Sequence, residues 1–391
     1  MKCTVTVEFG EDIGQSFGSL FEARTADGSF ALGAGLCDVY NTRFRTDRHV
    51  VQFFARPANG DRPVSLEPLP RPSSASGTYM FSIGSDLVAM QPTDDALARV
   101  WDATTGSWST REGIATERIR LGAGELAFGS EQVWYDGRLI LDAPTEGSYQ
   151  RFYYANGHLC FYHVSRGERS EYRPWESDAD GFSRLYACPW RPSDPGPVDL
   201  AEAITLRLPI VGETTFSWGQ LGSEVLTCSN IGGVYVFDGS AWRMIREPAL
   251  GASFQVYTMV RYRDRLLLGQ YPSGELFAFD GDALERIEGW PPGIEGASPS
   301  ARECQTAMVW GGELHVGAWP WGELWRLDAE AEQWRSLGRL FTHPEVHADP
   351  IHPYEAQCGE LGLVSNQWGQ RVTSMVPLAD SLMISTSAKW P

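Results

Sequence analysis

Apolar and polar residues alternate along many short stretches of this chain, and turns rich in glycine and proline separate the stretches. Runs such as TVTVEF, GVYVF and ELFAF have a period of two, as expected for strands with one buried face. Apolar stripes with the period of a helix are hard to find. The pattern therefore predicts an all-β protein made of many short strands.

Three stretches with this alternation resemble one another. Each has a strand, a short turn containing Gly or Pro, a second strand that ends in an apolar residue and Asp, and a third strand. The three copies are residues 223–245, 264–287 and 312–337. Aligned on Leu226, Leu268 and Val316, successive copies are 42 and 48 residues apart. A repeat of about 40 to 50 residues built from short strands is typical of a β-propeller.

A further apolar strand precedes each copy, so the predicted unit, or blade, has four strands, called A to D here. These first strands are residues 215–222, 257–264 and 305–311, and residues 372–379 are the equivalent strand of a further, last unit. Weaker units follow the same pattern upstream, at residues 15–57, 78–112, 124–141 and 149–164. Seven blades are the most natural count, and six or eight also fit the repeat. We expect one propeller domain, residues 1–391.

The last unit stops after its second strand, at the C-terminal end of the sequence. We expect the strand at residues 2–9 to pair with this C-terminal blade and to close the ring. Closure of this kind leaves no open sheet edge.

Two positions in the repeat carry a family signature. Trp242 and Trp334 open the last strand of their units, and Gly269 and Gly317 end the second strand. A Trp and a double glycine at these places are features of kelch repeats, although each glycine stands alone here. Over residues 215–391 the chain therefore resembles the kelch-type β-propellers, with a degenerate signature. The resemblance implies a fold that hosts both enzymes and interaction modules.

Composition excludes several classes of function. The formal net charge of −18 favours solubility and disfavours nucleic acid, whose phosphates require a basic surface. No run approaches the roughly 18 apolar residues of a membrane helix. The start, MKCTVTVEFGED, indicates a strand and no signal peptide. We therefore expect a cytoplasmic protein as written, secreted or periplasmic if a leader was removed, without nucleic-acid or membrane partners. The oligomeric state stays open.

Strand direction predicts where a binding site would lie. Because consecutive strands alternate in direction, the B–C turns and the D–A connections lie on one rim of the propeller. The B–C turns are short and aromatic, with Tyr271, Trp319 and Trp321. The D–A connection at 341–371 is a long insertion, and such insertions usually map to the binding face. We expect both features at the mouth of the central channel.

The insertion contains groups suited to acid–base chemistry. We expect His343, His352 and Tyr354 to form a catalytic centre, because imidazole is the usual acid or base at neutral pH and a nearby arginine could lower the pKa of a tyrosine. The residues expected to bind substrate are Arg302, Arg371, Trp319, Trp321, Tyr271, Glu303 and Gln370. The alternative is that these residues only solvate or order the loop.

His343, His347 and His352, with Cys358 nearby, could also hold a divalent metal such as zinc, manganese or calcium. No known ligand signature is present, and an ordered loop whose histidines bond to backbone explains the spacing equally well. A kelch-type oxidase with a metal bound by Tyr and His is a third alternative.

Together these features favour a carbohydrate-active propeller enzyme whose partner is a polysaccharide or oligosaccharide. A lyase acting on a uronic-acid-containing glycan is preferred to a glycoside hydrolase, because arginine beside a His or Tyr base can neutralise the uronate. Paired carboxylates such as Glu345 with Asp349 could instead act hydrolytically. The competing hypothesis is a non-catalytic kelch-like module that binds protein or glycan.

Overall fold

The structure is a computed structural model that describes residues 131–290 continuously and the rest of the chain in separate segments. Before residue 58 only the strand backbone is described. The described residues are 18–25, 28–35, 52–57, 68–72, 79–83, 86–90, 98–111, 118–121, 124–129, 131–290, 292–294, 303–328, 332–346, 352, 356, 360–362, 369–378 and 381–389. No helix among them is long and apolar enough to span a membrane.

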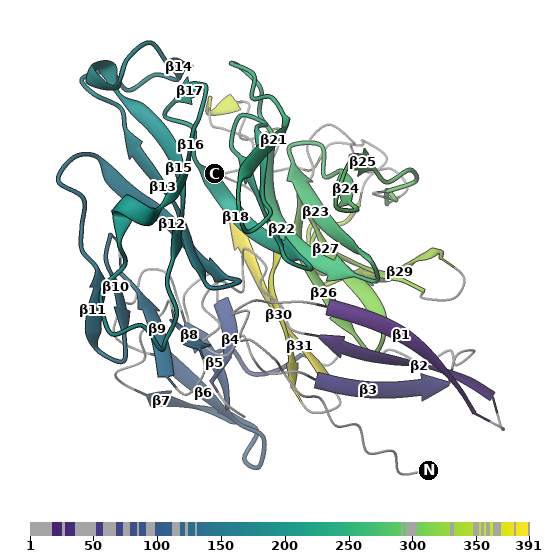
Figure 1. The fold of residues 1–391 in the computed structure, drawn as a ribbon. Helices are drawn as coiled ribbons and strands as arrows, with labels where there is room; N and C mark the ends of the chain where they lie inside the picture. Colours follow the sequence, from purple (N-terminus) through teal and green to yellow (C-terminus); the bar gives the residue numbers. More distant parts are fainter. Residues whose placement is uncertain are drawn as a thin grey trace.

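The molecule is an all-β propeller, as predicted, with antiparallel sheets arranged about a common centre (Figure 1). Six blades have four strands each. The first three blades are β4 to β7 (Tyr79–Ile83, Asp86–Met90, Ala98–Asp102, Ser107–Arg111), β8 to β11 (Arg118–Leu121, Gly124–Phe128, Val133–Tyr135, Arg138–Leu141), and β12, β13, β15 and β16 (Ser148–Ala155, His158–Ser165, Phe182–Pro189, Ile204–Arg207). The next three are β18 to β21 (Thr215–Leu221, Glu224–Ser229, Val234–Phe237, Trp242–Arg246), β22 to β25 (Gln255–Tyr262, Arg265–Tyr271, Leu276–Phe279, Leu284–Arg286), and β26 to β29 (Glu303–Trp310, Glu313–Trp319, Glu323–Leu327, Trp334–Arg339).

Shorter elements complete the description. A three-stranded sheet contains β1 to β3 (Gly18–Thr25, Gly28–Gly35, Gln52–Pro57), a two-stranded sheet contains β14 and β17 (Arg173–Pro174, Ile210–Val211), and a hairpin contains β30 and β31 (Gly369–Leu378, Ser381–Lys389). Two 3-10 helices, η2 (Asp178–Asp180) and η3 (Leu200–Glu202), lie in connections of the third blade.

The hairpin β30–β31 lies between the sixth blade and the first. Strand β30 packs against β26 and β27 on one side and against β4 on the other. The hairpin therefore supplies the two strands expected for the last unit. The described residues form six complete blades, the lowest of the three counts considered and one fewer than the preferred seven. The strand predicted at residues 2–9 lies outside the described residues, so closure by that strand stays a prediction.

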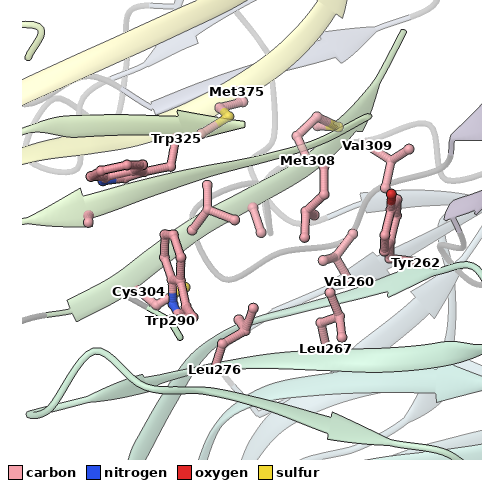
Figure 2. Close-up of a cluster of buried hydrophobic side chains, with 14 of the residues drawn as sticks. Val260, Tyr262, Leu267, Leu276, Trp290, Cys304, Met308, Val309, Trp325 and Met375 are labelled. Carbon is pink, nitrogen blue, oxygen red and sulfur yellow. The ribbon is translucent and has the colours of Figure 1, made fainter. Parts of the chain in front are cut away.

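Apolar side chains fill the space between adjacent blades. Figure 2 shows one such cluster, which contains Val260 and Leu267 of the fifth blade and Met308 and Trp325 of the sixth. Met375 of β30 joins the same cluster. Each blade thus buries its two faces against its neighbours, which explains why strands such as β27 are buried along their whole length.

Two tryptophans of the repeat, Trp242 and Trp334, contribute to packing between the blades. Trp242 lies 5.1 Å from the Phe237 ring and donates its indole N–H to the Ile204 carbonyl of the third blade at 3.0 Å. Trp334 lies 4.1 Å from the ring of Trp290. Both therefore stabilise packing between blade elements.

The first strands of four sheets share a β-bulge, and a hydroxyl residue follows each bulge. These residues are Ser217, Thr258, Thr306 and Ser374. Ser217 donates to the Val256 carbonyl and Thr306 to the Val372 carbonyl, both at 2.7 Å. Each bond joins the innermost strand of one sheet to that of the next. The repeat therefore contains a hydrogen-bonded link between neighbours as well as apolar packing.

Candidate functional site

The B–C turns and the D–A connections do share one rim. Single parallel bridges pair Ile231 with Phe254 and Trp321 with Gln370. Ile231 and Trp321 belong to B–C turns. Phe254 directly precedes β22, and Gln370 lies at the beginning of β30, so each bridge joins a B–C turn to the start of the next sheet. The Gln370 N–H also donates to the Pro320 carbonyl at 2.8 Å. The B–C turn of the sixth blade is therefore fastened to the beginning of β30.

The long insertion packs against this same turn. The His352 ring lies 4.2 Å from the Trp321 ring, at an interplanar angle of 54°. The Arg339 guanidinium lies 4.8 Å from the Trp321 ring and donates to the Gln370 side chain at 3.0 Å. Gln370 in turn donates its side-chain amide to the His343 carbonyl. The structure thus brings together the insertion and the aromatic turn.

The two described histidines of the insertion differ in exposure. The His343 side chain is exposed, whereas His352 is fully buried. Burial, and then the positive charge of Arg339, lowers the pKa of His352 to about 4. His352 is therefore neutral near pH 7 and packs as part of the rim. Of the two predicted catalytic residues that the structure describes, His343 reaches the surface and His352 does not; Tyr354 lies outside the described residues.

The aromatic side chains of the turns are also buried. Trp319, Trp321 and Tyr271 are 0%, 1% and 7% exposed. The Gly369 backbone has φ of +100° and lies so close to the Trp319 indole that a Cβ there would be 2.1 Å from Nε1. Only glycine allows this approach. The rings thus pack inside the rim, and their predicted stacking on a ligand stays a prediction.

Glu303 and Arg371 form an ion pair below the rim surface. Arg371 Nη2 lies 3.7 Å from Glu303 Oε1, and the two side chains are 11% and 1% exposed. The Arg371 guanidinium lies 6.0 Å from the Trp319 ring. The charge expected to bind a substrate carboxylate is therefore already matched by a carboxylate of the protein. Arg302, the other predicted arginine, lies outside the described residues.

A polar residue lies near the start of five innermost strands, three residues before pairing resumes after the register shift; Thr214 directly precedes β18, and the shift skips two residues in β12 and one in each of the other strands. We call these residues the inner ring: Gln150, Thr214, Gln255, Glu303 and Arg371. Thr214 Oγ1 donates to Gln150 Oε1 at 2.9 Å. Neighbouring members also meet in the ion pair above. The inner ring is thus a set of amide, hydroxyl and paired ionic groups contributed by successive sheets.

Sequence reasoning missed a second insertion on this rim. The B–C connection of the third blade, residues 166–181, is long, and its β14 pairs with β17 of the following D–A connection. It exposes Tyr172, whose hydroxyl accepts a hydrogen bond from the Asn230 amide. The signal was the stretch EYRPWE, which combines aromatic residues and proline as the other B–C turns do.

The predicted metal site is not assembled among the described residues. No group of three His, Cys, Asp or Glu side chains within them is placed to hold a metal ion. His347 and Cys358 lie outside them, so a site formed by His343, His347 and His352 stays a prediction.

Comparison with known proteins gives no family. No family model matches the chain, and no curated protein does. Many solved structures resemble it, and these include the following three. The computationally designed Ika8 protein is 12% identical with a TM-score of 0.42, over 81% of this chain and 96% of its own. BBS1N in complex with ARL6DN is 12% identical with a TM-score of 0.41, over 82% and 95%. BamB from Moraxella catarrhalis is 12% identical with a TM-score of 0.39, over 78% and 77%.

TM-scores below 0.5 at 12% identity do not establish a family for this chain, so the kelch-type resemblance stays a prediction. The sheet order therefore identifies the architecture, a β-propeller with six four-stranded blades among the described residues.

Proposed function

We propose that this propeller binds a hydroxyl-rich carbohydrate over the inner ring. The observation that carries the proposal is the inner ring itself, in which five consecutive sheets contribute amide, hydroxyl and ionic groups near the start of their innermost strands, with Thr214 bonded to Gln150 and Arg371 paired with Glu303. Amides and hydroxyls both donate and accept hydrogen bonds, as sugar hydroxyls do. A few convergent polar groups on a rigid frame are what orients a small polar ligand.

The charges of the inner ring favour a neutral glycan over a uronate. The opposite charges of Glu303 and Arg371 cancel, and the other members of the inner ring are neutral. At 3.7 Å and an effective dielectric constant near 20, two unit charges attract by about 4 kcal/mol. A uronate would have to compete with Glu303 for Arg371, in a protein of net charge −18. Recognition of a neutral sugar is therefore better supported than the lyase chemistry preferred from sequence.

Cleavage is the second candidate, and exposure of His343 supports it. Its backbone is held by Gln370, while its imidazole is exposed on the rim. An accessible imidazole beside a bound sugar can act as a general acid or base. His352 cannot share that role without leaving its buried contact with Trp321.

A binding screen tests the proposal. The full chain is titrated with neutral and acidic polysaccharides, and each mixture is assayed for new reducing ends and for the ultraviolet absorbance of unsaturated uronates. Gln255→Ala should weaken binding of a responsive neutral glycan about tenfold, the effect of one hydrogen bond.

Gln333→Ala, an exposed site in a C–D connection of the opposite rim, is the control and should bind as the wild type does. Absence of binding across the panel would refute the proposed function. New products that disappear in His343→Ala would establish cleavage.

A further inference from the structure

Tyr172 lies on the same rim as the inner ring, in the connection between β13 and β15. It is 36% exposed, unlike the buried aromatic residues of the other B–C turns. The adjacent β14 pairs with β17, which holds this connection next to the D–A segment that leads into β18. Of the rim aromatics discussed above, Tyr172 is thus the one with a substantial surface open to a ligand.

The ring of Tyr172 is fixed by close contacts. Gly212 has φ of +90°, and a Cβ there would lie 3.2 Å from Cδ1 of Tyr172, so the ring lies against the glycine backbone. The Arg166 guanidinium lies 5.3 Å from the ring centroid. A ring held in this way loses little conformational entropy when a ligand stacks on its open surface.

Hydrogen bonds connect Tyr172 to the inner ring through one residue. Asn230 donates its side-chain amide to the Tyr172 hydroxyl. The Asn230 N–H donates to the Thr214 carbonyl at 2.9 Å, and the Thr214 N–H donates to Asn230 Oδ1 at 3.3 Å. Thr214 then bonds to Gln150 of the inner ring. An unbroken series of hydrogen bonds therefore joins the Tyr172 hydroxyl to the inner ring.

Trp175, the other aromatic residue of this connection, is less available. The Arg207 guanidinium lies 3.4 Å from its ring centroid and covers one face. Its indole N–H donates to Asp178 Oδ1 at 3.2 Å. These contacts give Trp175 a structural role in the connection.

We propose that Tyr172 forms a second sugar-binding position, so that the rim binds an oligosaccharide of two or more units. This rests on the proposed function. One unit lies over the inner ring, and the next stacks its C–H face on the exposed ring of Tyr172, as apolar faces stack on aromatic rings. The Tyr172 hydroxyl, which accepts from Asn230, retains its own hydrogen to donate to a sugar oxygen.

Length dependence tests this assignment. The full chain is titrated calorimetrically with glucose and xylose and with their β-1,4- and α-1,4-linked oligomers of two to six units. We expect affinity to rise from monomer to oligomer in the wild type. Tyr172→Ala should weaken oligomer binding about five- to tenfold and leave monosaccharide affinity unchanged. Tyr172→Phe keeps the ring and should retain most of the oligomer affinity.

Leu139→Ala is the control, because Leu139 is 40% exposed on the outer strand β11. Circular dichroism verifies that each variant is folded. Oligomer affinity equal in wild type and Tyr172→Ala would overturn the second position while leaving the proposed function standing. Failure of the wild type to bind these sugars and every glycan of the panel above would overturn both proposals.

Discussion

Replacement of Glu213 by glutamine should stabilise this protein above neutral pH. Glu213 lies between Gly212, which supports Tyr172, and Thr214 of the inner ring. Its side chain is fully buried, and Tyr235 donates its hydroxyl to Glu213 Oε1 at 2.6 Å. Burial raises the pKa of this carboxyl to about 7, although hydrogen bonds from the Ser229 and Tyr235 hydroxyls favour the charged form.

The sign and size of the effect follow from linkage. In the unfolded chain the carboxyl has a pKa of 4.5, so folded Glu213 keeps a proton that the unfolded chain releases between pH 4.5 and about pH 7. Stability from this group is complete below pH 4.5 and is lost as the pH rises through 7. A shift of about 2.5 pKa units corresponds to roughly 3 kcal/mol. Glutamine has no charge to desolvate and can still accept from Tyr235.

Urea denaturation followed by tryptophan fluorescence at pH 5, 6, 7 and 8 measures the difference. The free energy of unfolding of Glu213→Gln should exceed that of the wild type by about 2 to 3 kcal/mol at pH 8, and the gain should shrink toward pH 5. Glu345→Gln, an exposed carboxyl on the same rim, is the matched control and should show no gain. If Glu213→Gln and the wild type lose stability in parallel as the pH rises, the reasoning is refuted.

Three further changes test the rim and the links between sheets. Arg371→Met removes the positive charge beside the buried Glu303 carboxylate and should cost about 3 to 5 kcal/mol of unfolding free energy. The double variant with Glu303→Gln should recover part of this, and a purely additive cycle would contradict the pairing. Thr306→Val removes the bond to the Val372 carbonyl and should cost about 1 to 2 kcal/mol in urea denaturation, whereas an unchanged midpoint would show that the link adds nothing. Because His352 stays neutral when folded, wild-type stability should fall as the pH drops from 6.5 toward about 4; His352→Gln should flatten this fall in thermal melts, and an unchanged slope would count against it.

The strand repeat could be recognised in the sequence because each blade buries both faces in the same way and so repeats the same apolar positions. The copies at 223–245, 264–287 and 312–337 are confirmed as parts of the fourth, fifth and sixth blades. Upstream, where the repeat decays, the sequence did not show how 124–141 and 149–164 were grouped. The structure assigns them to the second and third blades. Local alternation identifies strands, but their grouping depends on pairing between strands.

The equivalent hydroxyls at Ser217 and Thr306 were also visible in the aligned repeats. Their purpose was not, because each bonds to a carbonyl of the next sheet, which lies 39 residues away in one case and 66 in the other. A sequence reports which groups are present at a position, whereas their partners depend on how neighbouring sheets meet.

For the candidate site, topology alone placed the aromatic turns and the 341–371 insertion on one rim, because strand direction determines which connections lie together. The sequence also determined the polar chemistry available there. Only the tertiary structure decided which side chains face solvent: the tryptophan corners and His352 are buried, while Tyr172 is exposed. It also decided that Glu303 neutralises Arg371. Exposure and ion pairing depend on distances between segments far apart in the chain, which alternation and spacing do not specify.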